Sequence, residues 1–257
     1  MTVTATWAGT GAAAGGLLTV KVLTGAALKQ NGAAIASILV TAPELAITPN
    51  ATGSWVYGVV GQYIAGTVFS GITAATQAAF SGNVADATHS VAYGTFRSLN
   101  TTTATVSTGL LGATAVAEPA GDINIALAEI LADPNGPGLA EDASAPASVS
   151  VTGAVQTVTT ASFTPPAVSL LVVMAVPDGN GTNPYTTTIT SSLGLTWTLL
   201  VTAGVAGGTE LGIWVAQVPT LFSIPPQPGG KAWRRRHRRP QTPVRIVPGF
   251  EGWGHQL

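Results

Sequence analysis

Short runs of β-branched and aromatic residues, each bounded nearby by Gly, Asn or Pro, recur along the chain. Leu17–Leu23, Trp55–Val60 and Trp197–Val201 are examples. Such runs are typical of strands, because branched and aromatic side chains pack well on a pleated surface and the bounding residues favour turns. Lys and Glu pairs at helical spacing, which support surface helices, are scarce. The pattern predicts an all-β fold.

One segment leaves the choice of element open. Asp122–Leu131 contains Ala, Leu and Glu, which are good helix formers, but it alternates polar and apolar residues at its start. We favour a strand here, with a short helix as the alternative.

Two segments rich in Pro and Gly divide the sequence. Asp133–Ala147 also carries three acidic residues, and Ile224–Gly230 has three prolines and two glycines, which cannot continue a strand ladder or a helix. We therefore predict a first β-sandwich domain at 1–140, a second and shorter one at 148–222, and a C-terminal arm at 223–257.

The two predicted domains share an order of features. The apolar run at residues 17–23 corresponds to 169–176, the Trp-containing stretch 47–60 corresponds to 189–201, and 89–96 corresponds to 210–217. This order predicts tandem, related, jelly-roll-like β-sandwiches. The second domain has no counterparts to the last strands of the first, so its sheet is expected to have an unpaired edge that a neighbour can extend.

Charge is scarce and unevenly distributed. Charged residues make up 8% of the chain, against roughly a quarter in an average soluble domain. Low charge suits faces covered by neighbouring subunits, because interface cores are depleted in Lys, Glu and Asp. A secreted, low-charge β protein is the alternative explanation. Residues 1–230 carry three cations and ten acids, a net charge of −7, whereas the last 27 residues carry seven cations and one acid, a net charge of +6.

The basic arm is the strongest local signal. We expect it to bind the acidic face of an adjacent copy through bidentate Arg–carboxylate pairs, with aromatic anchors. A nucleic-acid partner has a mechanism in counterion release but is disfavoured, because a basic run is more often solvated or docked on acidic residues. The residues assigned to this assembly arm are Trp233, Arg234, Arg235, Arg236, Arg238, Arg239, Arg245 and Trp253.

No motif indicates catalysis, a metal site or a cofactor. The chain lacks cysteine, has three histidines without a suggested catalytic partner, and contains no nucleophile elbow, zinc-protease motif or phosphate-binding loop. We therefore predict a protein that is not an enzyme. The apolar stretch Leu17–Val40 is interrupted by Lys21, Lys29 and Gln30, so no membrane insertion is expected.

Strand tryptophans suggest a second kind of binding. Trp55, Trp197 and Trp214 lie in predicted strands, where a ring face could stack on a sugar of a host-surface glycan. Core packing is the default for a tryptophan in a strand. The glycan-binding adhesion module is therefore the alternative to a structural role.

Three stretches of the second domain carry a family resemblance. They are TASFTPPAVSLLVV at 160–173, SLGLTWTL at 192–199 and GIWVA at 212–216. Over residues 148–220 they resemble a β-sandwich module of minor tail and other virion proteins from bacteriophages of actinobacteria. The resemblance implies a structural protein of the virion, in the tail or as a decoration protein on the capsid surface, whose partners are other virion proteins and copies of itself.

Overall fold

All regular elements in the described part of the chain are β-strands. The seventeen strands form four sheets in which every pairing is antiparallel, so the all-β prediction is confirmed. Residues 123–130 form a strand, as favoured over the alternative of a short helix for Asp122–Leu131. The computed structural model describes residues 1–8, 15–40, 45–63, 69–74, 78–86, 91–99, 106–113, 123–152, 156–177, 186–204 and 210–220.

The central layer is a six-stranded sheet with the order β11-β2-β14-β17-β16, in which β12 also pairs with β2. Every residue of β14 is buried, as are all but two of β2, because other sheets cover both of their faces. This two-sided burial accounts for the nearly continuous apolar sequence of β14. The strands are β2 (Gly15–Thr24), β11 (Ala140–Glu141), β12 (Val149–Thr152), β14 (Leu170–Pro177), β16 (Thr198–Ala203) and β17 (Leu211–Gln217).

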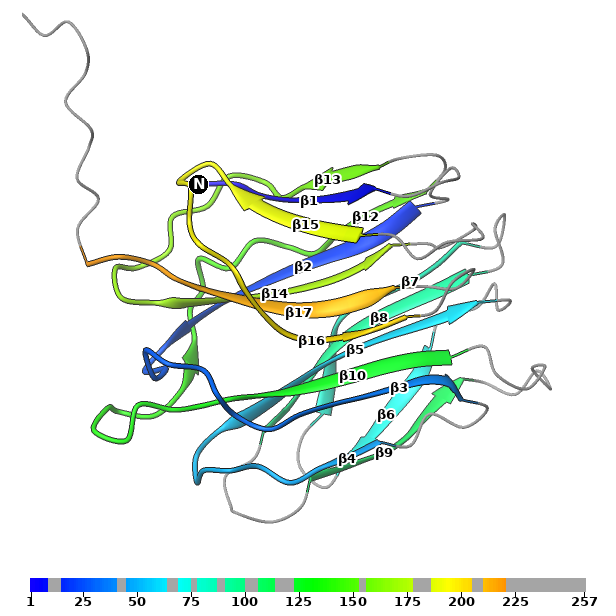
Figure 1. Ribbon diagram of the computed structural model, residues 1–257, viewed down its shortest axis with the longest axis horizontal. Coiled ribbons are helices and arrows are strands. Elements are labelled where there is room, and N and C mark those ends of the chain that lie inside the picture. The colour runs from blue at the N-terminus through cyan, green and yellow to red at the C-terminus, as the bar shows by residue number, and fades with distance from the viewer. Residues whose placement is uncertain are drawn as a thin grey trace, which may run out of the picture. The chain divides into compact units, whose positions relative to one another are not determined.

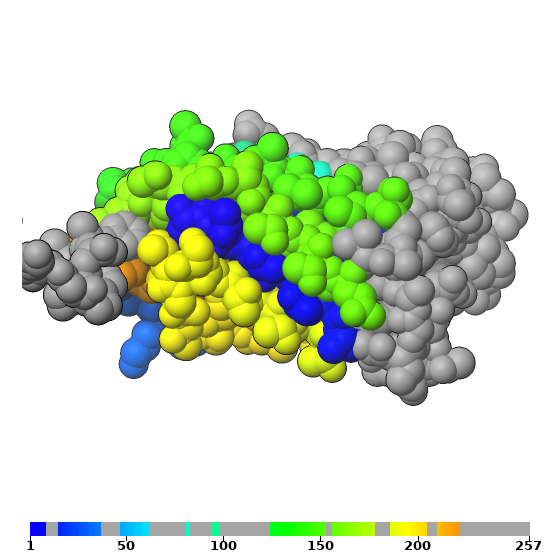
Figure 2. Space-filling model, turned by 90° about the horizontal axis from the view of Figure 1, so that it is seen from above, coloured from blue at the N-terminus to red at the C-terminus, as the bar shows by residue number. Residues whose placement is uncertain are grey.

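A small three-stranded sheet covers one face of the central layer (Figure 1). It has β1 (Val3–Ala8) between β13 (Thr157–Thr159) and β15 (Thr186–Ser191). Alternate residues of β1 are buried, and the largest of them, Trp7, is fully enclosed. Figure 2 shows the outer face of this sheet, with β1 in blue between the other two strands.

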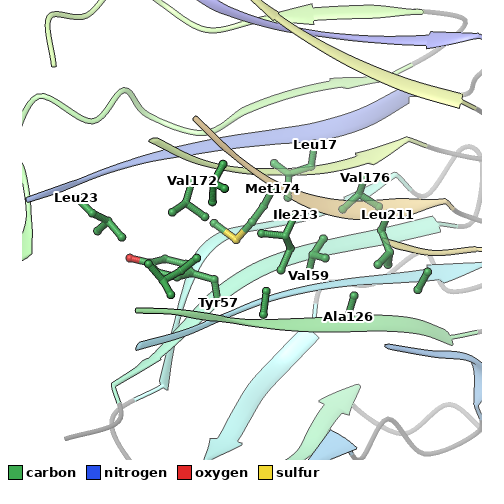
Figure 3. Close-up of a cluster of buried hydrophobic side chains, with 14 of the residues drawn as sticks. Leu17, Leu23, Tyr57, Val59, Ala126, Val172, Met174, Val176, Leu211 and Ile213 are labelled. Carbon is green, nitrogen blue, oxygen red and sulfur yellow. The ribbon is translucent and has the colours of Figure 1, made fainter. Parts of the chain in front are cut away.

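A five-stranded sheet with the order β3-β10-β5-β8-β7 covers the opposite face. Tyr57 and Val59 of β5 meet Met174 of β14 and Ile213 of β17 in the apolar cluster of Figure 3. A further three-stranded sheet has the order β4-β9-β6. The strands of these two sheets are β3 (Ala34–Val40), β4 (Leu45–Ile47), β5 (Trp55–Tyr63), β6 (Phe69–Ala74), β7 (Ala78–Asp86), β8 (Val91–Leu99), β9 (Val106–Ala113) and β10 (Ile123–Ile130).

The sheets do not divide at the predicted domain boundary of residues 140–148. Among the described strands, β1 pairs only with strands from after that boundary, and β2 pairs with β11, β12 and β14. The physical reason is that β2 is apolar on both faces and needs strand partners on both edges, which the later part of the chain supplies. Met1–Leu221 form one structural unit, and Phe222–Leu257, a second unit, lie outside the described residues.

A buried carboxylate fastens two loops to the five-stranded sheet. Glu129 of β10 is 1% exposed, and its Oε2 accepts hydrogen bonds from the backbone N–H groups of Ala33 and Asn50, both at 2.8 Å. Its Oε1 accepts the N–H of Ala51 at 3.0 Å. Burial by itself raises the pKa of Glu129, but hydrogen bonds from the Ser54 hydroxyl and these N–H groups outweigh it, so the pKa lies below its ordinary value of 4.5.

We predict that Glu129→Gln lowers the free energy of unfolding by roughly 2 to 4 kcal/mol, because an amide N–H₂ would face backbone N–H donors. Since the folded-state pKa is depressed, the carboxylate's contribution is complete above about pH 4.5 and is lost as the pH falls through the folded pKa. Denaturant titrations across that pH range should therefore show that the free energy of unfolding falls less with decreasing pH in the variant than in the wild-type chain.

The matched control is Glu210→Gln. Burial raises the pKa of Glu210, and the described residues give it no hydrogen bond that opposes this shift, so neutralising the side chain should leave stability nearly unchanged. Equal destabilisation by the two substitutions would contradict the role given to Glu129.

Candidate functional site

The three tryptophans proposed for glycan stacking do not form one platform. Trp214 of β17 is 8% exposed and belongs to the apolar cluster beneath the small sheet, against which Trp197 also packs. Trp55 packs against the cluster on the opposite face of the central layer, and the Arg97 guanidinium lies 4.8 Å from its ring centroid. Trp214 is therefore a core residue, and one face of the Trp55 ring is already covered.

The arm residues assigned from the sequence, from Trp233 to Trp253, lie outside the described residues, as do all three histidines. The described ranges contain no group of three or more His, Cys, Asp or Glu side chains that could hold a metal ion. Among the same residues, no helix is long and apolar enough to cross a membrane.

Among the described residues, a cluster of charged and polar side chains joins two layers around one carboxylate. Glu141 of β11 accepts the Tyr57 hydroxyl at 3.0 Å, and its oxygens lie 2.8 Å from Arg97 and 3.3 Å from Lys21. Lys21 and Glu141 belong to the central sheet, whereas Tyr57 and Arg97 belong to the five-stranded sheet. With three donors on its two oxygens, Glu141 acts as a clamp between the layers. Sequence reasoning missed it because the four residues come from distant strands.

Two open strand edges form a second candidate surface. β16 ends the central sheet and β3 ends the five-stranded sheet, and the two strands contact each other. Within the described residues, β16 pairs only with β17, and this edge belongs to the central sheet and not to the separate second-domain sheet predicted from the sequence. Neither strand contains a charged residue, and Leu199 of β16 is 47% exposed and Ile35 of β3 37% exposed. We call β3 and β16 together the open-edge surface.

A pocket of about 470 Å³ opens beside β16. Residues 28–31, which connect β2 to β3, form one wall, and residues 215–217 of β17 with Leu170, Thr196 and Thr198 form the rest. Leu28 at its rim is 74% exposed. None of these residues was predicted as a site, because the segments that meet here are far apart in the sequence.

Comparison with protein-family models, with curated proteins and with solved structures finds no match to this chain.

We predict that Tyr57 ionises late in an alkaline ultraviolet titration of the folded protein. Burial raises its pKa above the ordinary value of 10.0, and the negative charge and hydrogen bond of Glu141 raise it further, against the smaller opposite effect of Arg97. Because the folded-state pKa is raised, the stability that this group contributes is complete below pH 10 and is lost as the pH rises through the folded pKa.

The tyrosinate absorbance of Tyr57 is the difference between the wild-type titration and that of a Tyr57→Phe control. It should appear above pH 10, and Glu141→Gln should lower the pH at which it appears. A Tyr57 signal at its ordinary pKa in the folded protein would contradict the clamp.

Proposed function

We propose that this chain is a non-enzymatic structural protein of a bacteriophage virion, a minor tail protein, that assembles through its β-sandwich surfaces and its basic C-terminal arm. The observation that carries the proposal is the open-edge surface. It presents two uncharged strand edges with exposed Leu199 and Ile35 side by side. Soluble proteins usually protect such edges with charges or proline, so an unprotected pair favours a neighbour that covers it.

The layered fold supports a role in assembly. Its stability comes from stacked sheets, so the surface strands are free to carry contacts with neighbours rather than a reaction centre. The few charges of the described residues are partly committed to internal pairs, as in the Glu141 clamp. A surface with so little charge left suits burial against other virion proteins or copies of the same chain.

The arm supplies the electrostatic part of the proposal. Its net charge of +6 is opposite to the −7 of residues 1–230. We propose that its arginines pair with carboxylates of an adjacent copy, with Trp233 and Trp253 as apolar anchors. The resemblance of residues 148–220 to virion modules is consistent with this role. Placement on the capsid surface as a decoration protein is the variant of the same proposal.

We predict that light scattering finds the full chain in assemblies and that Leu199→Lys disperses them. A lysine on the edge strand would have to be buried without a partner in the contact. A version of the chain ending at Pro228 should also show reduced assembly, because it lacks the basic segment.

The matched control is Thr188→Lys, which places the same charge at an exposed position of β15 on a different sheet. It should leave assembly intact. A full chain that is monomeric at all concentrations, or equal dispersal by Leu199→Lys and Thr188→Lys, would overturn the open-edge mechanism.

A further inference from the structure

The pocket beside β16 combines an apolar floor with polar side chains. Leu170 and Val215 form the floor and belong to the buried cluster between the central and five-stranded sheets. Lys29, Gln30, Asn31, Thr196, Thr198 and Gln217 contribute amide, hydroxyl and ammonium groups to its lining. Its volume of about 470 Å³ lies in the range of small-molecule sites.

Both glutamines named in the pocket lining, Gln30 and Gln217, are held in place by hydrogen bonds to the backbone. The Gln30 side-chain amide donates to the carbonyls of Ala27 at 2.8 Å and Leu131 at 3.2 Å and accepts the Leu131 N–H at 2.8 Å. The Gln217 Nε2 donates to the Val168 carbonyl at 3.0 Å. Groups fixed in this way lose little conformational freedom when a ligand binds.

One acceptor in this lining lacks a donor. The Gln217 Oε1 is buried and has no hydrogen-bond partner in the described part of the chain. A buried polar atom without a partner destabilises the protein by roughly 1 to 3 kcal/mol relative to a satisfied one. Because Oε1 has almost no exposed surface, this cost belongs to the fixed position of the side chain, and Oε1 itself is not offered to a ligand.

The charge of the pocket selects among hydroxylated ligands. Lys29 is exposed, and within the described residues it has no ion pair or hydrogen bond. Among the described residues that line the pocket there is no carboxylate, so their net charge is positive although residues 1–230 are acidic. An ammonium group without a counter-charge favours a ligand carboxylate.

From these features we infer that the pocket binds an acidic sugar of the uronic acid class. The carboxylate pairs with Lys29, and the C–H face of the ring lies on Leu170 and Val215. The amide and hydroxyl groups of Asn31, Thr196 and Thr198 provide both donors and acceptors for the remaining hydroxyls. The inference does not depend on the virion assignment or on assembly. It gives the glycan-binding alternative a specific site, different from the three tryptophans.

The test is saturation-transfer NMR of the full chain with free D-glucuronate as the probe and D-glucose as the neutral comparison. We expect saturation transfer to glucuronate with a Kd on the order of 1 mM for a single sugar unit, and binding of glucose weakened about tenfold by loss of the charged contact.

Lys29→Met keeps most of the side-chain length and removes the charge, so it should weaken glucuronate binding about tenfold and leave glucose binding unchanged. Gln217→Met should weaken both sugars, because it removes the amide that Gln217 contributes to the polar lining. The matched control is Gln156→Met at an exposed position next to β13, outside the pocket, which should change neither. Denaturant midpoints of all three variants show whether each is folded.

Two results would overturn the inference. The first is no saturation transfer to glucuronate in the wild-type chain. The second is glucuronate binding that Lys29→Met leaves unchanged, since Lys29 is exposed and its substitution does not disturb the core. Equal binding of glucose and glucuronate would overturn the assignment to acidic sugars. Assembly, measured separately by light scattering, is unaffected by any of these outcomes, so failure here is distinguishable from failure of the proposed function.

Discussion

The antiparallel pairing of β2 with β14 places two strands that are buried on both faces at the centre of the molecule. Each face of this pair carries its own apolar cluster, one shared with the small sheet and one shared with the five-stranded sheet. A change that separates β2 from β14 would expose both clusters together, because both strands contribute residues to each cluster. The pairing also joins the start of the chain to its second half.

Polar contacts complete this arrangement where apolar packing ends. Glu129 satisfies backbone N–H groups of two loops that reach the five-stranded sheet, and Glu141 draws Lys21, Tyr57 and Arg97 together across two layers. Charged residues make up 8% of the chain, and these two carboxylates are used in hydrogen bonds and ion pairs within the fold. The same scarcity leaves the open-edge surface without a charge on either strand, so fold and proposed assembly follow from one property of the composition.

The sequence predicted the class of fold and many strands, because β-branched runs and turn residues are local signals. β14, β16 and β17 lie where such runs predicted strands. Pairing was not predictable in this way, since partners such as β1 and β15 are far apart in the chain. Close packing between distant strands is equally hidden in the sequence: Gly16 lies in β2, and a Cβ at this position would lie 2.4 Å from the Trp7 ring. The candidate pocket escaped prediction for the same reason, because Lys29 and Gln217 meet only in the folded chain.

The pairing of strands from the two halves of the chain can be tested directly, because the chain has no cysteine of its own. Thr4 of β1 and Thr159 of β13 are cross-strand partners whose Oγ1 atoms lie 2.9 Å apart, so cysteine sulfurs at these two positions start close to each other. Peptide mapping of a Thr4→Cys, Thr159→Cys variant, oxidised at low protein concentration, should find an intramolecular disulfide. A Thr4→Cys, Thr202→Cys control, with the second cysteine on β16, should not form one. A folded double variant whose cysteines at 4 and 159 stay reduced would contradict the shared core.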